Sequence, residues 1–185
     1  MALDFTTSCL ADALSLFRMY KKMGEAAMAQ LDDGDFARAL DAEMNSVAII
    51  VKHMAGNMRS RWQGFPEADG EKPDRNRDSE FDAPPQGREA VLALWERGWA
   101  DVLDALEPLR ETDMSRRVTI RGEAHSITQA VHRQMTHYAY HVGQIVFLAK
   151  HLTAAGGREW HSLSIPRRGS AEFNRRVAEG KASQR

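Results

Sequence analysis

Seven histidines are the residues of this sequence with the clearest capacity for chemistry, and two of them stand four positions apart. This pair is His137 and His141, within a stretch of helical periodicity. Side chains at positions i and i+4 of a helix lie one above the other, so both imidazoles can reach one metal ion at about 2.0–2.1 Å. The spacing alone also allows a second interpretation, in which each histidine is half-buried and bonded to a backbone carbonyl.

A metal site needs a third ligand, and the helical geometry points to His53. At about 100° per residue, His137 and His141 fall beside the apolar stripe of their helix, and His53 falls on the same-handed flank of an earlier helix. Three imidazoles on the rims of two inward faces would converge near the core, within reach of water. The other histidines do not pair at ligand spacing and are expected to play no part: His125, His132, His151 and His161.

Several sharper motifs fail in this sequence. Tyr138 stands where a zinc peptidase helix carries its glutamate base, so that mechanism is not supported. Residues 74–78 begin like a calcium-binding loop, but Ser79 replaces the glycine that the loop requires. The single cysteine, Cys9, has no histidine near it in sequence and is interpreted as a small buried apolar residue rather than a nucleophile.

Four segments with helical periodicity must position these side chains. They cover about residues 6–31 and 42–62, a third segment from residue 88 to Pro108, and a fourth that carries its apolar positions from residue 131 to residue 152. Glycines at 156 and 157 end the fourth segment, as expected at a helix C-terminus. Each segment is apolar on one face only, so the sequence predicts an all-α fold, a four-helix bundle.

The connections are unequal. A polar crossover at residues 64–87 joins the second and third helices, and connections this long are usually functional or disordered. If it is ordered, it can wall the metal cleft, and Arg75 and Arg77 can present guanidinium groups to an anionic ligand, controlling substrate access. A short hairpin is expected at residues 117–123. Residues 1–157 are assigned to the bundle, and 158–185 to an extended segment packed on it, with a frayed end.

The composition narrows the class of protein. The 185 residues carry 25 basic and 26 acidic side chains, a net charge of −1, so neither nucleic acid nor an anionic membrane is indicated as a partner. The longest apolar run is only five residues, and residues 1–4 begin no signal peptide. One cysteine excludes a disulfide within the chain, so a cytoplasmic protein is expected. Four tryptophans and nine methionines leave apolar surface for a partner face, which suggests a homodimer.

Two stretches carry a family resemblance: 51–57, around His53, and 137–145, which closes on His-Val-Gly-Gln-Ile. With them, the sequence resembles the DinB-like, or YfiT-like, superfamily of candidate metalloenzymes. These are four-helix bundles with one histidine from helix two and a His-x-x-x-His pair from the last bundle helix. Over residues 1–175, further stretches look like one subgroup of that superfamily: 60–62, 69–73, 76–81 and 163–166.

The resemblance implies one divalent ion (zinc, nickel or iron) on His53, His137 and His141. Characterised relatives include thiol-dependent S-transferases and a mycothiol-dependent maleylpyruvate isomerase, so it also implies a metal-dependent enzyme that activates a low-molecular-weight thiol or water, a thiol S-transferase or a hydrolase. The alternative is a non-catalytic, structural or sensory metal site on a dimeric bundle. No catalytic residue is identified. Asn57 and Gln144 are the candidates to support the ligands from behind, and Glu43 is a further polar candidate nearby.

Overall fold

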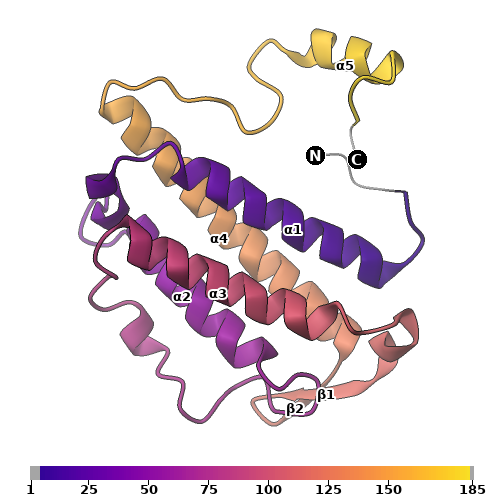
Figure 1. The fold of residues 1–185 in the computed structure, drawn as a ribbon. Coiled ribbons are helices and arrows are strands. Elements are labelled where there is room, and N and C mark those ends of the chain that lie inside the picture. Colours follow the sequence, from indigo (N-terminus) through magenta and orange to yellow (C-terminus); the bar gives the residue numbers. More distant parts are fainter. Residues whose placement is uncertain (1–4, 184–185) are drawn as a thin grey trace.

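The computed structural model describes residues 5–183 and is mostly helical (Figure 1). The predicted four-helix bundle is confirmed. Its helices are α1 (Cys9–Met28), α2 (Val47–Trp62), α3 (Arg88–Leu106) and α4 (Ile127–Ala155), followed by a fifth helix, α5 (Ser170–Ala178). The shorter elements are strands β1 (Arg117–Ile120) and β2 (Glu123–Ser126) and the 3-10 helices η1 (Asp33–Ala37), η2 (Asp78–Glu80) and η3 (Glu111–Ser115). Across residues 5–183, no helix combines the length and the apolar character that a membrane span requires. The predicted absence of a signal peptide concerns residues 1–4, outside the described range.

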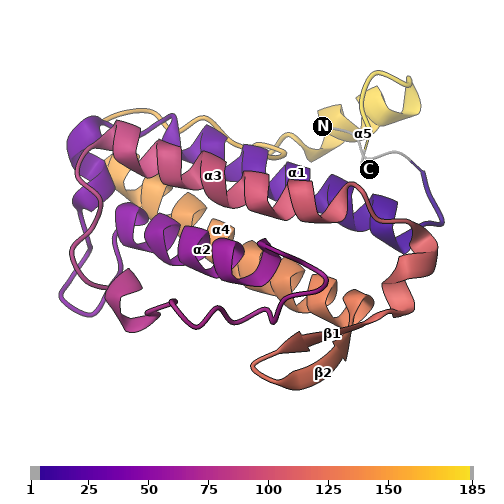
Figure 2. The same ribbon diagram turned by 60° about the horizontal axis from the view of Figure 1, so that its bottom comes forward.

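The direction of the helices explains the long crossover. Helices α1 and α4 run one way and pack together, whereas α2 and α3 run the opposite way and pack together (Figure 1). Because α2 and α3 are parallel neighbours, the chain must return along the bundle between them. Residues 63–87 make that return, passing along α2 with one turn of 3-10 helix on the way (Figure 2).

Side-chain caps set the starts of the helices that carry the histidines. Ser46 accepts a hydrogen bond from the amide of Ile49 (3.3 Å), so α2 begins at Val47 and not at the predicted residue 42. Ser126 accepts from the amide of Gln129 (3.1 Å), and the Gln129 side chain accepts from the Ser126 amide (2.9 Å). This capping box starts α4 one turn before the predicted apolar stripe.

An aromatic core fixes the rotation of α4. Tyr138 is fully buried, with its ring 5.8 Å from Phe17 and 5.6 Å from Trp99 between centroids. Its hydroxyl accepts a hydrogen bond from Trp62 Nε1 (2.9 Å) and donates to Asn57 Oδ1 (3.2 Å). Since Tyr138 points into the core, its neighbour His137 is directed to the rim of the α2–α4 interface.

The predicted hairpin is confirmed and is joined to the crossover. Strands β1 and β2 are antiparallel and turn at Arg121 and Gly122, both with positive φ (56° and 75°). The crossover contacts this hairpin through the Gly70 amide, which donates to Thr119 O (2.8 Å). The same segment therefore touches α2, where His53 lies, and the hairpin that precedes α4.

The C-terminal segment differs in part from the prediction. Trp160 and Leu163 pack against the hydrophobic core, as an extended segment laid on the bundle would. Residues 170–178, however, form helix α5, which has no buried residue. Ion pairs within the helix support it, from Arg175 to Glu172 and Glu179. The chain beyond α5 still makes backbone hydrogen bonds to it, and residues 184–185 of the predicted frayed end lie outside the described residues.

Candidate metal centre

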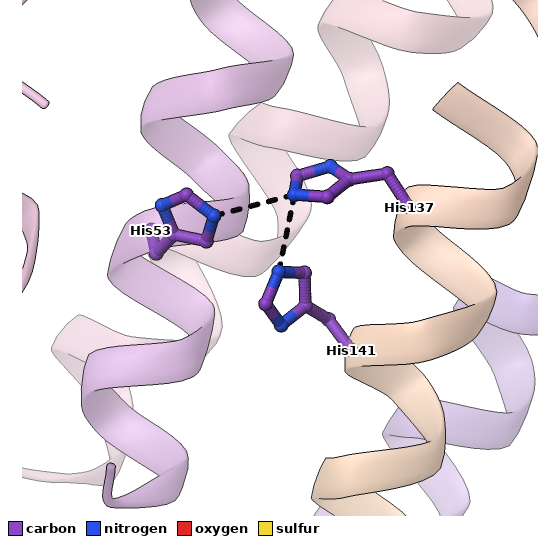
Figure 3. Close-up of side chains that lie close together, drawn as sticks. All are labelled: His53, His137 and His141. Carbon is purple, nitrogen blue, oxygen red and sulfur yellow. Dashed lines mark hydrogen bonds between the residues drawn. The ribbon is translucent and has the colours of Figure 1, made fainter. Parts of the chain in front are cut away.

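Three imidazoles converge between α2 and α4 (Figure 3). His53 comes from α2, and His137 and His141 come from successive turns of α4. His137 Nε2 lies 3.3 Å from His53 Nε2 and 3.1 Å from His141 Nε2. The structure thus brings together the three histidines that the sequence singled out.

The donor set fits a divalent ion. Three nitrogens held at 2.0–2.1 Å by a tetrahedral ion are about 3.3 Å apart, close to the separations found. The ligand atoms all lie within 4.8 Å of one another, and among the described residues the group contains no fourth histidine, cysteine or carboxylate. Three neutral nitrogen ligands with a position left open is the arrangement of catalytic rather than structural zinc sites.

Hydrogen bonds to the outer ring nitrogens orient two of the ligands. His53 Nδ1 lies 2.8 Å from Glu80 Oε2, and His141 Nδ1 lies 2.8 Å from Gln144 Oε1. An ionised carboxylate only accepts, so His53 must donate its Nδ1 proton to Glu80, which leaves the Nε2 lone pair for a metal. Gln144 thus lies behind His141, and its role in supporting a metal ligand stays a prediction.

Glu80 itself is held by a buried chain of charges from the crossover. Arg75 donates from Nε to Glu80 Oε1 (2.8 Å) and from Nη2 to Glu80 Oε2 (3.0 Å), and its Nη1 donates to Glu71 (3.1 Å). Burial opposes ionisation of Glu80, but the bonds from His53 and Arg75 hold its pKa below the usual value. Gly56 makes room for this carboxylate, because a Cβ at that position would collide with it. A bidentate pair of this kind fixes the position of Glu80 behind His53.

Burial keeps two of the imidazoles neutral. It lowers the pKa of His137 from 6.5 to about 3, and the neighbouring His141 and His53 act in the same direction. Burial also lowers the pKa of His141, against the opposing effect of its bond to Gln144. Neutral imidazole is the form that binds metal ions, so the site needs no proton loss from these rings at pH 7.

The other predicted site residues lie in different surroundings. Asn57 accepts a hydrogen bond from the Tyr138 hydroxyl, and within residues 5–183 it forms no hydrogen bond with a histidine ring. Glu43 is exposed, in a hollow that it shares with Gln144. Arg77 stacks on Phe81, whose ring lies against His53 (centroids 4.7 Å apart).

A second contact between reactive side chains appears outside the cluster. Cys9 is half-buried, and its Sγ lies 3.7 Å from His132 Nε2. The sequence shows no histidine near Cys9 along the chain, and it predicted a small buried apolar residue there and an ordinary interface histidine at 132. Cys9 is instead only half-buried and lies beside His132. The two residues are 123 positions apart, so only the packing of α1 on α4 could reveal the contact.

A pocket of about 360 Å³ opens beside the cluster. His53, His137 and Asn57 line it, and Arg75 and Arg77 reach it from the crossover as predicted. No aspartate or glutamate lines the pocket within the described part of the chain. Two histidines of the cluster therefore border a pocket of small-molecule size, and the charged residues that line it are all arginines.

Glu80 provides a test of this geometry. The Glu80→Ala variant should bind zinc about 10–100-fold more weakly than the parent, because His53 loses the group that orients it and fixes its tautomer. Asp78→Ala is the matched control on the same 3-10 helix, since the Asp78 side chain is 97% exposed. Competition titration with a chromophoric chelator measures both affinities. Equal affinities of Glu80→Ala and parent would show that Glu80 does not support the ligand.

Comparisons with known proteins place the chain in a family. Residues 4–169 match the model of the family described as "Protein of unknown function (DUF1572)". Among curated proteins, none matches the chain. The crystal structure of a DinB-like protein from Bacillus cereus ATCC 10987 is similar in fold, with a TM-score of 0.57 and 11% sequence identity over 82% of this chain and 95% of that one. The chain therefore belongs to the DUF1572 family and has the DinB-like four-helix-bundle fold.

Proposed function

We propose that the chain binds one divalent metal ion through the Nε2 atoms of His53, His137 and His141. The observation that carries this is the convergence of three Nε2 atoms, of which His137 Nε2 lies 3.3 Å from that of His53 and 3.1 Å from that of His141. Glu80 and Gln144 orient the rings of His53 and His141 from behind. Imidazole suits zinc, nickel and iron alike, so the donor set does not select among them.

We further propose that the site is catalytic and activates a thiol or water. A bound divalent ion would supply the positive charge that lowers the pKa of a coordinating thiol or water. The pocket supports access, because His53 and His137 line both the cluster and the pocket. A structural ion would instead be expected behind a fourth protein ligand.

The surroundings favour a thiol over water. Glu80 is committed to His53 and Arg75, and the pocket has no free carboxylate along its described lining to act as a general base. A free thiol has a pKa near 8.5 and needs less help to ionise than water does. A thiol S-transferase therefore agrees better with the residues present than a hydrolase does.

Cobalt substitution distinguishes this function from the alternative, a non-catalytic structural or sensory metal site. In the cobalt-loaded protein, added cysteine or 2-mercaptoethanol should produce a sulfur-to-metal charge-transfer absorption, because the thiolate takes the open position. The hydroxyl analogues, serine for cysteine and ethylene glycol for 2-mercaptoethanol, are the controls and should not produce this absorption. A spectrum that no thiol changes would indicate a closed site and favour the non-catalytic module.

We also propose that the chain forms a homodimer. Leu40, Met44 and Phe147 are exposed (38%, 48% and 66%) and line one shallow hollow between the segment before α2 and helix α4. Light scattering should give about 42 kDa, twice the 20.8 kDa of one chain. Phe147→Asp should shift the mass toward the monomer, because it places a charge in the apolar patch. Val177→Asp on α5 is the control, and a monomeric parent would contradict the proposal.

A further inference from the structure

The pocket beside the three histidines is lined by five arginines from four parts of the chain. Arg61 comes from the end of α2, Arg75 and Arg77 from the crossover, Arg121 from the hairpin turn and Arg133 from α4. We call this set the arginine pocket. Segments far apart in the sequence thus bring arginine side chains together next to His53 and His137.

Two of the five charges are compensated by neighbouring acids. Arg75 pairs with Glu80 and Glu71, and Arg61 pairs with Glu71. These two guanidinium groups are largely buried, so they form the fixed inner wall of the pocket.

The other three guanidinium groups carry charge that the protein leaves almost uncompensated. Among the ion pairs of the described residues, Arg77 has only a 3.9 Å contact with Asp78, and Arg121 only a 3.5 Å contact with Glu71. Arg133 forms no ion pair with any of residues 5–183. Three like charges around one pocket repel each other, and a bound anion would relieve that repulsion.

Two residues that line the same pocket, Gln134 and His137, each carry a buried polar atom without a partner among the described residues. Gln134 is only 5% exposed, and its Oε1 forms no hydrogen bond within the described chain. His137 Nδ1, one turn further along α4, is also buried and unpaired there. Buried polar groups are normally satisfied, and of these two atoms a protonated His137 Nδ1 needs an acceptor, whereas Gln134 Oε1 needs a donor, which a dianion cannot supply. If His137 Nε2 binds the metal, Nδ1 carries the proton and needs an oxygen acceptor.

The protein builds the turn that carries Arg121 with some strain. Arg121 has a φ of 56° in the first position of a two-residue hairpin turn, where asparagine or glycine is usual. The Asp69 carboxylate accepts from the amides of Arg121 and Gly122 (both 2.8 Å). These hydrogen bonds lower the pKa of Asp69 to about 2, and the bond from the Gly122 amide has the largest effect. The crossover therefore holds the turn in place beside the pocket.

We propose that the arginine pocket binds the dianionic head of a small organic substrate, a phosphate monoester or a dicarboxylate. Arg77, Arg121 and Arg133 supply the charge-assisted hydrogen bonds, and His137 Nδ1, when it carries the proton, donates one more. This orientation places the other end of the substrate at the three-histidine cluster, and in that respect it rests on the proposed metal site. Binding of the anionic head depends mainly on the arginines and does not require a bound metal.

Calorimetric titration of the zinc-loaded protein tests this proposal. Glycerol 3-phosphate and succinate are the two dianionic probes, and glycerol is the neutral control. At least one dianion should bind, with an affinity that falls as salt is added, whereas glycerol should not bind measurably. The probe that binds more tightly identifies the head group as phosphate or dicarboxylate.

Substitutions assign the binding to the pocket. Arg121→Gln and Arg133→Gln should each weaken binding of the preferred dianion about tenfold or more, because each removes a charged donor. Arg117→Gln is the matched control, an exposed arginine of the same hairpin that does not line the pocket. Equal affinities of all three variants would overturn the proposal, and so would a parent that binds neither dianion.

A further variant separates this proposal from the metal site. His141 is a proposed ligand but does not line the pocket, so His141→Ala should lose zinc and still bind the dianion within about threefold of the parent. A parent that binds the dianion but no metal would contradict the proposed function and leave the arginine pocket supported. A parent that binds zinc but no dianion would do the reverse. If His141→Ala loses the dianion together with the zinc, the anion binds to the metal and the arginine pocket is wrong.

Discussion

Element analysis of the purified parent should find about one divalent ion per chain, and the His137→Ala/His141→Ala variant should retain almost none. Four-ligand zinc sites bind with about 10–16 kcal/mol, roughly 3 kcal/mol per ligand. Removing two of three imidazoles should therefore weaken binding by about 10⁴-fold. His53, the one ligand that remains, is only 4% exposed, so donors on the protein surface cannot easily join it to complete a new site.

The control removes a histidine of α4 that lies outside the cluster. His151→Ala lies on the same helix, exposed and outside the cluster, and should keep the full metal content. Plasma mass spectrometry after dialysis against a weak chelator measures the ratio of metal to chain. Equal metal content in the double variant and the parent would show that the three-histidine cluster is not the metal site.

The position of the three histidines could be predicted because it depends on periodicity. His137 and His141 are one turn apart on a strongly periodic helix, and His53 lies beside a similar stripe on α2. The buried Tyr138 fixes which face of α4 points to the core, and this sets the direction of the His137 and His141 side chains. The bundle and the hairpin could be predicted for the same reason. Apolar residues spaced three and four apart indicate the helices, and alternation of apolar and polar residues indicates the strands.

The groups behind the ligands depend on long-range contacts, and the sequence identified only one of them. Gln144 is three residues from His141, so helix geometry suffices. Glu80 is 27 residues from His53, in a polar segment without periodicity, and only the path of the crossover brings it there. Asn57 is one turn after His53, but it turns toward Tyr138 instead. Proximity in sequence was therefore a poor guide to the partner of His53.

The structure also separates two arginines that the sequence analysis treated alike. Both Arg75 and Arg77 line the pocket, and their control of substrate access stays a prediction. The Arg75 side chain is 3% exposed and bonded to two carboxylates, whereas that of Arg77 is 53% exposed. Arg75 therefore holds the crossover against α2 as well as facing the pocket, and its removal should affect stability and metal binding in addition to any ligand.

Arg75→Ala should lower the free energy of unfolding by about 3–5 kcal/mol, the usual cost of removing one partner of a buried ion pair. The substitution leaves the Glu80 carboxylate buried with only His53 as a partner, and it also removes the bond to Glu71. Denaturant unfolding followed by tryptophan fluorescence measures the change. Arg77→Ala is the matched control, and its effect should stay within about 0.5 kcal/mol because that side chain is half in solvent.

A double variant separates the loss of packing from the loss of charge pairing. In Arg75→Met/Glu80→Gln neither buried charge remains, so part of the stability lost in Arg75→Ala should return. Limited proteolysis between residues 64 and 87 adds a local reading, since the crossover should be cut faster in Arg75→Ala than in the parent or in Arg77→Ala. If Arg75→Ala is as stable and as resistant to cleavage as Arg77→Ala, the ion pair does not hold the crossover. Metal content measured on the same samples then shows whether the position of Glu80 behind His53 depends on Arg75, because a released crossover takes Glu80 away from the ligand that it orients.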